Sequence, residues 1–316
     1  MRVFVTVLAV AMLVGCAAQP TPTREPVELI DVAQPAQVFG GDCSAMFTDV
    51  ALSEALGQAV SPLDWQQGVD PESLLVEQVG GIHCVWGALD TSPVLAVVVV
   101  PASAVTVPEE TVCVGTMISN TSCPVDVTAN GTRLSGVVTA DFEGADSLAR
   151  VAAVEALFTA SANAVAPVVP TLIAGAWANP IDCAGVAENV DWVALGGSAD
   201  VVPDDTMGTD VYASAVEREL RGGRVLGWCY LYSPGISIAP AFWALGGGAW
   251  ARDAVLAQDG ATVVDVPGLD LVVETPVEGG TTIDIFDGVN WLRSDLRGPE
   301  TYPVLFAITD ELDAGV

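Results

Sequence analysis

Four of the seven cysteines fall into two similar arrangements, and these constrain the fold more than any other feature of the sequence. An Asp-Cys pair opens each arrangement, at Asp42-Cys43 and Asp182-Cys183, and precedes a segment of helical character. The second cysteine, Cys84 or Cys229, follows a Gly-Gly pair and lies in a run of β-branched and aromatic residues that is typical of a strand. The sequence therefore predicts one structural unit that occurs twice.

Each unit continues with a second helix, several strands and a closing helix. In the first unit, Asp70-Pro71-Glu72 predicts a capped helix that ends at Gly80-Gly81, and the run 95–100 predicts a strand. This order predicts an α+β fold with two tandem related domains, each an antiparallel sheet with helices packed on one face. The residues expected on the inner faces of the helices are Leu148, Val151, Val154 and Phe158 in the first unit, and Val186, Val190 and Val193 in the second.

Two further patterns divide the chain. A Gly-Thr pair opens a hairpin-like segment in each unit, at Gly131-Thr132 and Gly280-Thr281, and is taken to mark equivalent strands. Proline-containing stretches separate the folded parts. The expected segments are a signal peptide at 1–15, a lipidated cysteine and proline-rich tether at 16–40, domain one at 41–165, a linker at 166–175 and domain two at 176–316.

The cysteines other than Cys16 are expected to form disulfides, because six is an even number and the chain has the features of an exported protein. Six cysteines allow fifteen complete pairings. A duplicated unit favours duplicated bonds, Cys43–Cys84 and Cys183–Cys229, and leaves Cys113 and Cys123 as the third pair. On this interpretation Cys229 is a structural half-cystine and not a reactive thiol.

The N-terminus predicts export. Arg2 precedes an apolar run that is too short to span a bilayer, and Gly15 and Cys16 follow it. The stretch Leu13-Val14-Gly15-Cys16 resembles the lipobox of bacterial lipoproteins, which implies cleavage before Cys16 and a diacylglycerol thioether on its sulfur. The alternative is a plain signal peptide that contains a cysteine.

The two Asp-Cys openings, each followed by a cysteine on the first strand, resemble uncharacterised lipoprotein domains of high-GC actinobacteria. Arginine without lysine fits a high-GC genome. The resemblance implies a protein held by a lipid at Cys16 on the extracytoplasmic face of the cell membrane.

The net charge of −30 argues against functions that depend on phosphate contacts, because such a surface repels nucleic acid and anionic lipid headgroups. The acidity either keeps an exported protein soluble or includes cation sites. The densest acidic loop, Asp200 to Asp210, lacks the spacing of an EF-hand, so an acidic surface loop is favoured over a calcium site. We expect neither a metal nor a cofactor.

Aromatic residues of the second unit form the candidate ligand surface. Trp228, Tyr230 and Tyr232 alternate with Cys229 along the expected strand, and Trp243 follows nearby. Three rings on one sheet face are typical of stacking on sugars, but the same rings also fit a packed core.

These features favour a lipid-anchored envelope protein that binds a ligand or partner, such as a glycan or an envelope protein, without catalysis. The first alternative is a carboxylate-dependent hydrolase that acts on cell-wall material, for which the sequence offers forty acidic residues but no distinct pair. The second is the solute-binding component of a transporter, which requires alternating strands and helices. The single histidine, His83, neighbours Cys84 and is expected to be structural.

Overall fold

The computed structural model describes most of the chain from residue 30 onward. The described residues are 30–63, 69, 71–87, 93–105, 114–115, 121–140, 145–169, 173–177, 182–195, 200–203, 227–232, 241–278, 280–294 and 301–315.

The first half of the chain forms sheet one, which has six strands with antiparallel pairing in the order β1-β2-β3-β6-β5-β4. The strands are β1 (Ser61–Pro62), β2 (Ile82–Gly87), β3 (Pro93–Pro101), β4 (Val114–Gly115), β5 (Thr121–Ala129) and β6 (Thr132–Ala140). The helices are η1 (Val38–Gly41), η2 (Cys43–Ala45), α1 (Asp49–Leu56), α2 (Pro71–Gln78) and α3 (Ala145–Ala164).

The second half forms sheet two, which has seven strands with antiparallel pairing in the order β7-β8-β9-β13-β12-β11-β10. The strands are β7 (Val202–Pro203), β8 (Gly227–Tyr232), β9 (Ala241–Leu245), β10 (Thr262–Val264), β11 (Leu271–Val277), β12 (Gly280–Asp287) and β13 (Asn290–Ser294). The helices are α4 (Cys183–Asn189), η4 (Gly248–Ala251), α6 (Arg252–Leu256) and α7 (Tyr302–Ala314). The predicted α+β class with antiparallel sheets is confirmed.

The two sheets share one strand topology once the additional edge strand β10 is set aside. In each, three strands follow one another across the sheet, and the last strand of the half then pairs with the third. The predicted match between Gly131-Thr132 and Gly280-Thr281 is wrong, however. Gly131 lies with Asn130 in the positive-φ turn between β5 and β6, whereas Gly280 opens β12, the counterpart of β5.

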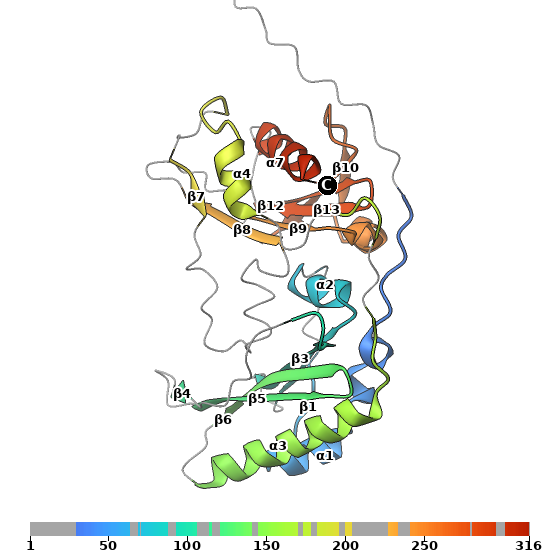
Figure 1. Ribbon diagram of the computed structural model, residues 1–316, viewed down its shortest axis with the longest axis vertical. Coiled ribbons are helices and arrows are strands. Elements are labelled where there is room, and N and C mark those ends of the chain that lie inside the picture. The colour runs from blue at the N-terminus through green and yellow to red at the C-terminus, as the bar shows by residue number, and fades with distance from the viewer. Residues whose placement is uncertain are drawn as a thin grey trace, which may run out of the picture.

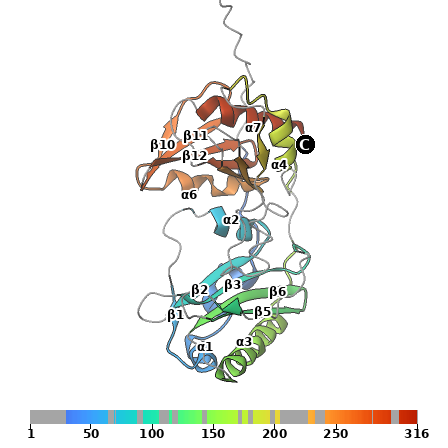
Figure 2. The ribbon, with the colours of Figure 1, turned by 90° about the vertical axis from the view of Figure 1, so that its left-hand side faces the viewer.

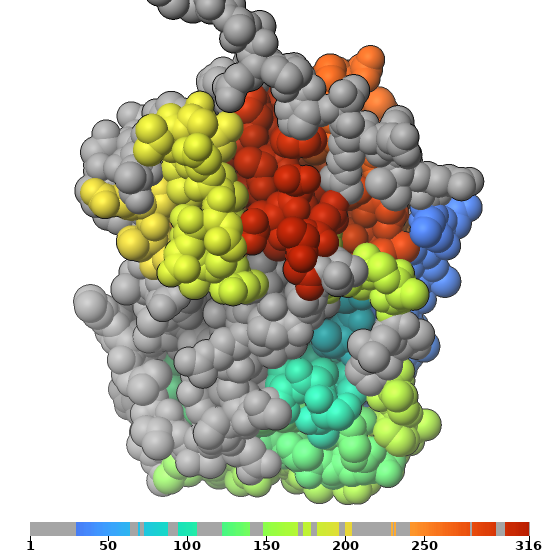
Figure 3. All heavy atoms as spheres, turned by 45° about the horizontal axis from the view of Figure 1, so that its top comes forward, coloured from blue at the N-terminus to red at the C-terminus, as the bar shows by residue number. Residues whose placement is uncertain are grey.

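The elements stack in layers (Figure 1). Helices α1 and α3 cover the outer face of sheet one, and α4 and α7 cover the outer face of sheet two, while α2 and α6 lie between the sheets (Figure 2). Figure 3 shows α4 and α7 side by side on the surface of the second half, where Asn189 Nδ2 donates to Glu311 Oε1 at 2.7 Å. Each outer helix layer and its sheet enclose a separate apolar core.

A third core lies between the halves, and we call it the shared core. It consists of residues from α2 and β3 in the first half and from β9, η4, α6, β11, β12 and β13 in the second, with Val105. Helix α2 therefore packs on the face of sheet one opposite to α1 and α3, and it also contacts the inner side of sheet two. Three consecutive apolar residues, Leu74, Leu75 and Val76, allow this because they point to more than one side of the helix.

The expected tether to residue 40 needs correction, because residues 30–41 pack against both halves. We call this segment the strap. Asp31 forms an ion pair with Arg252 at 2.6 Å, Val32 packs against the shared core, and Val38 is fully buried in the core of the first half. Apolar contacts thus hold a segment whose composition resembles a spacer.

Two residues expected on inner helix faces are exposed instead. Leu148 lies in the first turn of α3. Arg150, in the next turn, donates from Nη1 to the carbonyl of Leu56, the last residue of α1, so the first turn of α3 extends past the end of α1. Val193 lies beyond the end of α4, in a turn where the helical spacing no longer holds. The other residues predicted on inner helix faces are buried or partly buried.

Candidate functional site

A pocket of about 210 Å³ lies beside the disulfide of the first half. The strap, the β1–β2 edge of sheet one and the last turn of α2 provide its walls. Its lining residues are Gln37, Gly41, Cys43, Pro62, Leu63, Glu77, Ile82, His83, Cys84 and Val85.

The strap forms one wall of this pocket by means of an unusual turn. Phe39, Gly40 and Gly41 all have left-handed backbone, with φ of 54°, 65° and 78°. A Cβ atom at Gly41 would lie 2.2 Å from Gln37 Oε1, so only glycine lets the Gln37 side chain fold back over the turn. Asp42 follows and caps η2, and the hydrogen bonds from Ser44 lower the pKa of its exposed carboxyl.

The pocket contains three polar side chains from different elements. The Gln37 Nε2 atom from the strap is buried and has no hydrogen-bond partner. Glu77 from α2 accepts a hydrogen bond from Gln34 Nε2 at 2.8 Å. The third polar side chain, His83, lies on β2 between two residues of the lining. An amide, a carboxylate and an imidazole around an apolar floor are suited to binding a small polar molecule.

Disulfides join the opening helical segment of each half to its second strand. The pairs are Cys43–Cys84 and Cys183–Cys229, with Cα separations of 5.8 Å and 5.6 Å, and they are the pairs that the duplicated pattern predicts. Cys229 is buried and has no free thiol, so thiol chemistry at this position is excluded. Cys123 is disulfide-bonded as well, and its predicted partner Cys113 lies outside the described residues, as does Cys16.

The predicted aromatic surface is only partly within the described side chains. Trp228, Tyr230 and Tyr232 lie on β8, but their side chains are outside the described set, so a ligand surface there stays a prediction. Trp228 pairs in register with Trp243, which is half-buried against the shared core. Trp243 therefore packs the interior between the halves, as the alternative interpretation expected of such rings.

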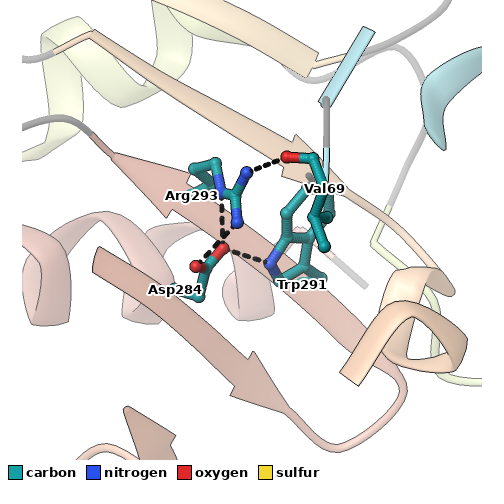
Figure 4. Close-up of polar contacts among 4 residues, drawn as sticks. All are labelled: Val69, Asp284, Trp291 and Arg293. Carbon is teal, nitrogen blue, oxygen red and sulfur yellow. Dashed lines mark hydrogen bonds and ion pairs between the residues drawn. The ribbon is translucent and has the colours of Figure 1, made fainter. Parts of the chain in front are cut away.

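A buried polar network lies on the inner face of sheet two (Figure 4). Arg293 binds Asp284 through two hydrogen bonds, with Nε to Oδ1 at 2.7 Å and Nη2 to Oδ2 at 2.9 Å. Trp291 Nε1 donates to Asp284 Oδ1 at 2.8 Å. The Arg293 guanidinium carbon lies over the Trp291 ring, 5.2 Å from the ring centroid. The remaining arm of Arg293 donates to the carbonyl of Val69, at the entry to α2.

Further contacts hold α2 to the second half. Gln78 Nε2 donates to the carbonyl of Gly246 at 3.1 Å, and Gln78 Oε1 accepts from the Trp250 ring at 2.5 Å. The Arg293 guanidinium thus donates to Asp284 in the second half and to the backbone carbonyl of Val69 before α2. This network positions α2 and joins the halves.

A similar ion pair occurs in sheet one, where the aspartate and the arginine are diagonal neighbours instead of directly opposite residues. Arg133 binds Asp126 with Nε to Oδ1 at 2.8 Å and Nη2 to Oδ2 at 2.6 Å. Asp126 and Asp284 therefore lie on different sheets and each binds an arginine, so they do not form the pair of carboxylates that glycoside hydrolysis uses. The sequence pattern does not single out these residues, although each half carries an aspartate and then an arginine in its last hairpin.

Two other expectations concern ions and membranes. No three His, Cys, Asp or Glu side chains within the described ranges gather closely enough to hold a metal ion. Of the acidic loop, only residues 200–203 are described. Among the described helices, none is both long and apolar enough to cross a membrane.

Comparison with known proteins gives no match to a family model, to a curated protein or to a solved structure. Function therefore has to be inferred from the chain's own residues.

Proposed function

We propose that this protein is a lipid-anchored extracytoplasmic protein that binds a small ligand, without catalysis, in the pocket beside Cys43–Cys84. The observation that carries the proposal is the pocket itself, in which the buried Gln37 amide faces no protein acceptor. A buried donor without a partner costs about 1–3 kcal/mol, so an oxygen atom of a ligand at this position would restore a favourable contact.

The disulfides fit an extracytoplasmic protein, since such bonds persist in oxidising compartments. Lipid anchoring is supported by the lipobox resemblance at Leu13-Val14-Gly15-Cys16. We expect Cys16→Ser to accumulate as unprocessed precursor without acyl label in a bacterial host that lipidates the unaltered chain. Labelling of the variant at the unaltered level would overturn the anchor assignment.

Binding without catalysis is favoured over hydrolysis by the composition of the pocket. Among the described lining residues Glu77 is the one carboxylate, whereas glycoside hydrolysis uses two carboxylates on opposite sides of the bond.

The single histidine provides a direct test, because His83 is a lining residue of the pocket and gives one set of imidazole NMR signals. Histidine-labelled protein would be screened against a library of cationic, neutral and anionic small molecules. We expect at least one saturable shift of the His83 signals. Absence of any saturable shift across the library would overturn ligand binding at this site.

Two matched variants separate pocket binding from nonspecific effects. Pro62→Trp places a large ring at the exposed mouth of the pocket and should abolish the shift. Val50→Trp adds the same ring at an exposed position of α1 outside the pocket lining and should leave the shift unchanged. Equal behaviour of the two variants would contradict the assignment of the pocket.

A further inference from the structure

We infer that the ligand of this pocket is a small amine that carries an oxygen acceptor close to its nitrogen. The inference rests on the proposed function, because it assigns a chemical class to the ligand of the same site. Three properties of the pocket carry it: its charge, its buried amide and its size.

The charge of the pocket favours a cation. Glu77 contributes a carboxylate to the wall, and the described lining residues include neither lysine nor arginine. Asp42 adjoins two lining residues, Gly41 and Cys43, and its exposed carboxylate adds negative charge beside the pocket. The chain as a whole carries a net charge of −30, which raises the local concentration of cations and repels anions. An ammonium group near Glu77 would therefore form a charge-assisted hydrogen bond.

The buried amide requires a second group on the ligand. The Gln37 Nε2 atom is a donor, and a bare alkylammonium offers it no acceptor. A hydroxyl or carbonyl oxygen accepts this hydrogen bond, so an amine with such an oxygen satisfies Gln37 and Glu77 together.

The size of the pocket limits the rest of the ligand. Pockets for drug-sized molecules have volumes of roughly 300–1,000 Å³, whereas this pocket has about 210 Å³. Four aliphatic residues, Pro62, Leu63, Ile82 and Val85, provide an apolar surface for a few carbon atoms. The pocket therefore accepts a small molecule or the end of a larger one, and not a glycan chain.

The test compares probes of nearly equal size through the His83 signals. 2-Aminoethanol has both groups, ethylamine lacks the oxygen, ethylene glycol lacks the amine, and glycolate is an anion. We expect 2-aminoethanol to bind about tenfold more tightly than each of the others, since ethylene glycol lacks the charge-assisted hydrogen bond to Glu77, ethylamine leaves the buried Gln37 donor without an acceptor, and glycolate is repelled by Glu77. Glu77→Gln should remove the preference over ethylene glycol, and Gln37→Leu the preference over ethylamine.

The outcomes distinguish this inference from the proposed function. If ethylene glycol or glycolate binds as tightly as 2-aminoethanol, or if Glu77→Gln changes nothing, the amine assignment is overturned while ligand binding stands. If these four probes fail but another library member binds saturably, the assignment is also overturned and the pocket stands. Failure of every molecule overturns both.

Two sources of such an amine can be separated in the same experiment. Free 2-aminoethanol represents a soluble solute, and vesicles of phosphatidylethanolamine present the same amine as a lipid headgroup. A saturable shift with either one supports the inference, and the stronger of the two identifies the source. Vesicles of phosphatidylglycerol, which lack an amine, should give no shift, and a shift with them would contradict it.

Discussion

Arg293 and Asp284 form a two-pronged ion pair across the last hairpin of sheet two, as Arg133 and Asp126 do in sheet one. Asp284 lies directly opposite Arg293, whereas Asp126 lies opposite Ser135 and binds Arg133 diagonally. In both halves the arginine lies on the last strand and the aspartate on the strand before it. Both pairs lie on the inner faces of the sheets, since Asp284 is registered with Val273 and Arg133 with Val100, two residues of the shared core. The halves thus resemble each other in buried polar chemistry as well as in strand order.

The buried pair in sheet two should be important for stability. Asp284→Asn leaves the Arg293 guanidinium buried without a counter-charge, and breaking such a pair costs about 3–5 kcal/mol. Urea unfolding would measure the loss. As a control, Asp31→Asn removes an ion pair to Arg252 in which the aspartate side chain is 92% exposed, and it should cost at most about 1 kcal/mol. Similar losses in the two variants would contradict the structural role of Asp284.

The joint between the halves should not tolerate an added methyl group at Gly246. A Cβ atom there would lie 2.3 Å from the carbonyl oxygen of Trp177, and backbone cannot move aside cheaply. We expect Gly246→Ala to lower the free energy of unfolding by about 1–3 kcal/mol. Gly315→Ala, where the nearest atom is 3.5 Å away, should be tolerated. Chemical denaturation of both variants is the measurement, and a neutral Gly246→Ala would mean that this contact is not close in solution.

Each disulfide closes a long loop, 41 residues for Cys43–Cys84 and 46 for Cys183–Cys229. Loops of this length predict a stabilisation of about 4 kcal/mol per bond through restriction of the unfolded chain. Replacing both cysteines of either pair by serine should therefore shift the urea midpoint strongly. Reductant should destabilise the unaltered protein further than either double variant, because it removes every bond. A double variant with an unchanged midpoint would show that the bond is dispensable.

Stability should fall at alkaline pH because of Tyr302. Burial, together with its hydrogen bond to Glu274, raises the pKa of Tyr302 from 10.0 to about 12. The folded state holds this proton more tightly than the unfolded state, so the contribution is complete below pH 10 and is lost as pH rises toward 12. Melting temperatures from pH 9 to 12 would show the decline. Tyr302→Phe should flatten it, and an equally steep decline in that variant would assign the loss to other groups.

Local signals explain what could be predicted from the sequence. Helix caps, Gly-Gly stops and β-branched runs act over a few residues, so they place α2, β2 and β3 and the paired cysteines closely. The repeat of these signals indicated two sheets of one kind. By contrast, the apolar run Leu74-Leu75-Val76 indicates burial on several sides of α2 but does not indicate what covers it. In the structure the second half of the chain covers it.

The pocket could not be predicted because three separate segments form it. From the sequence, Gln37 is interpreted as part of a proline-rich spacer, Glu77 as an exposed helix residue and His83 as a structural residue beside a disulfide cysteine. All three line the pocket. Only packing of the strap brings them together, and that packing depends on Val32 and Val38, two apolar residues in a polar stretch.

Docking of the strap also sets how far the molecule travels from its anchor. With Cys16 acylated as proposed, Ile30 at the start of the strap is fourteen peptide steps from the anchor, and fourteen steps span at most about 50 Å. Because the same strap supplies Gln37, anchoring at Cys16 would keep the binding site in the layer next to the bilayer. Ligands farther from the membrane would then have to diffuse to the bilayer surface to reach the pocket.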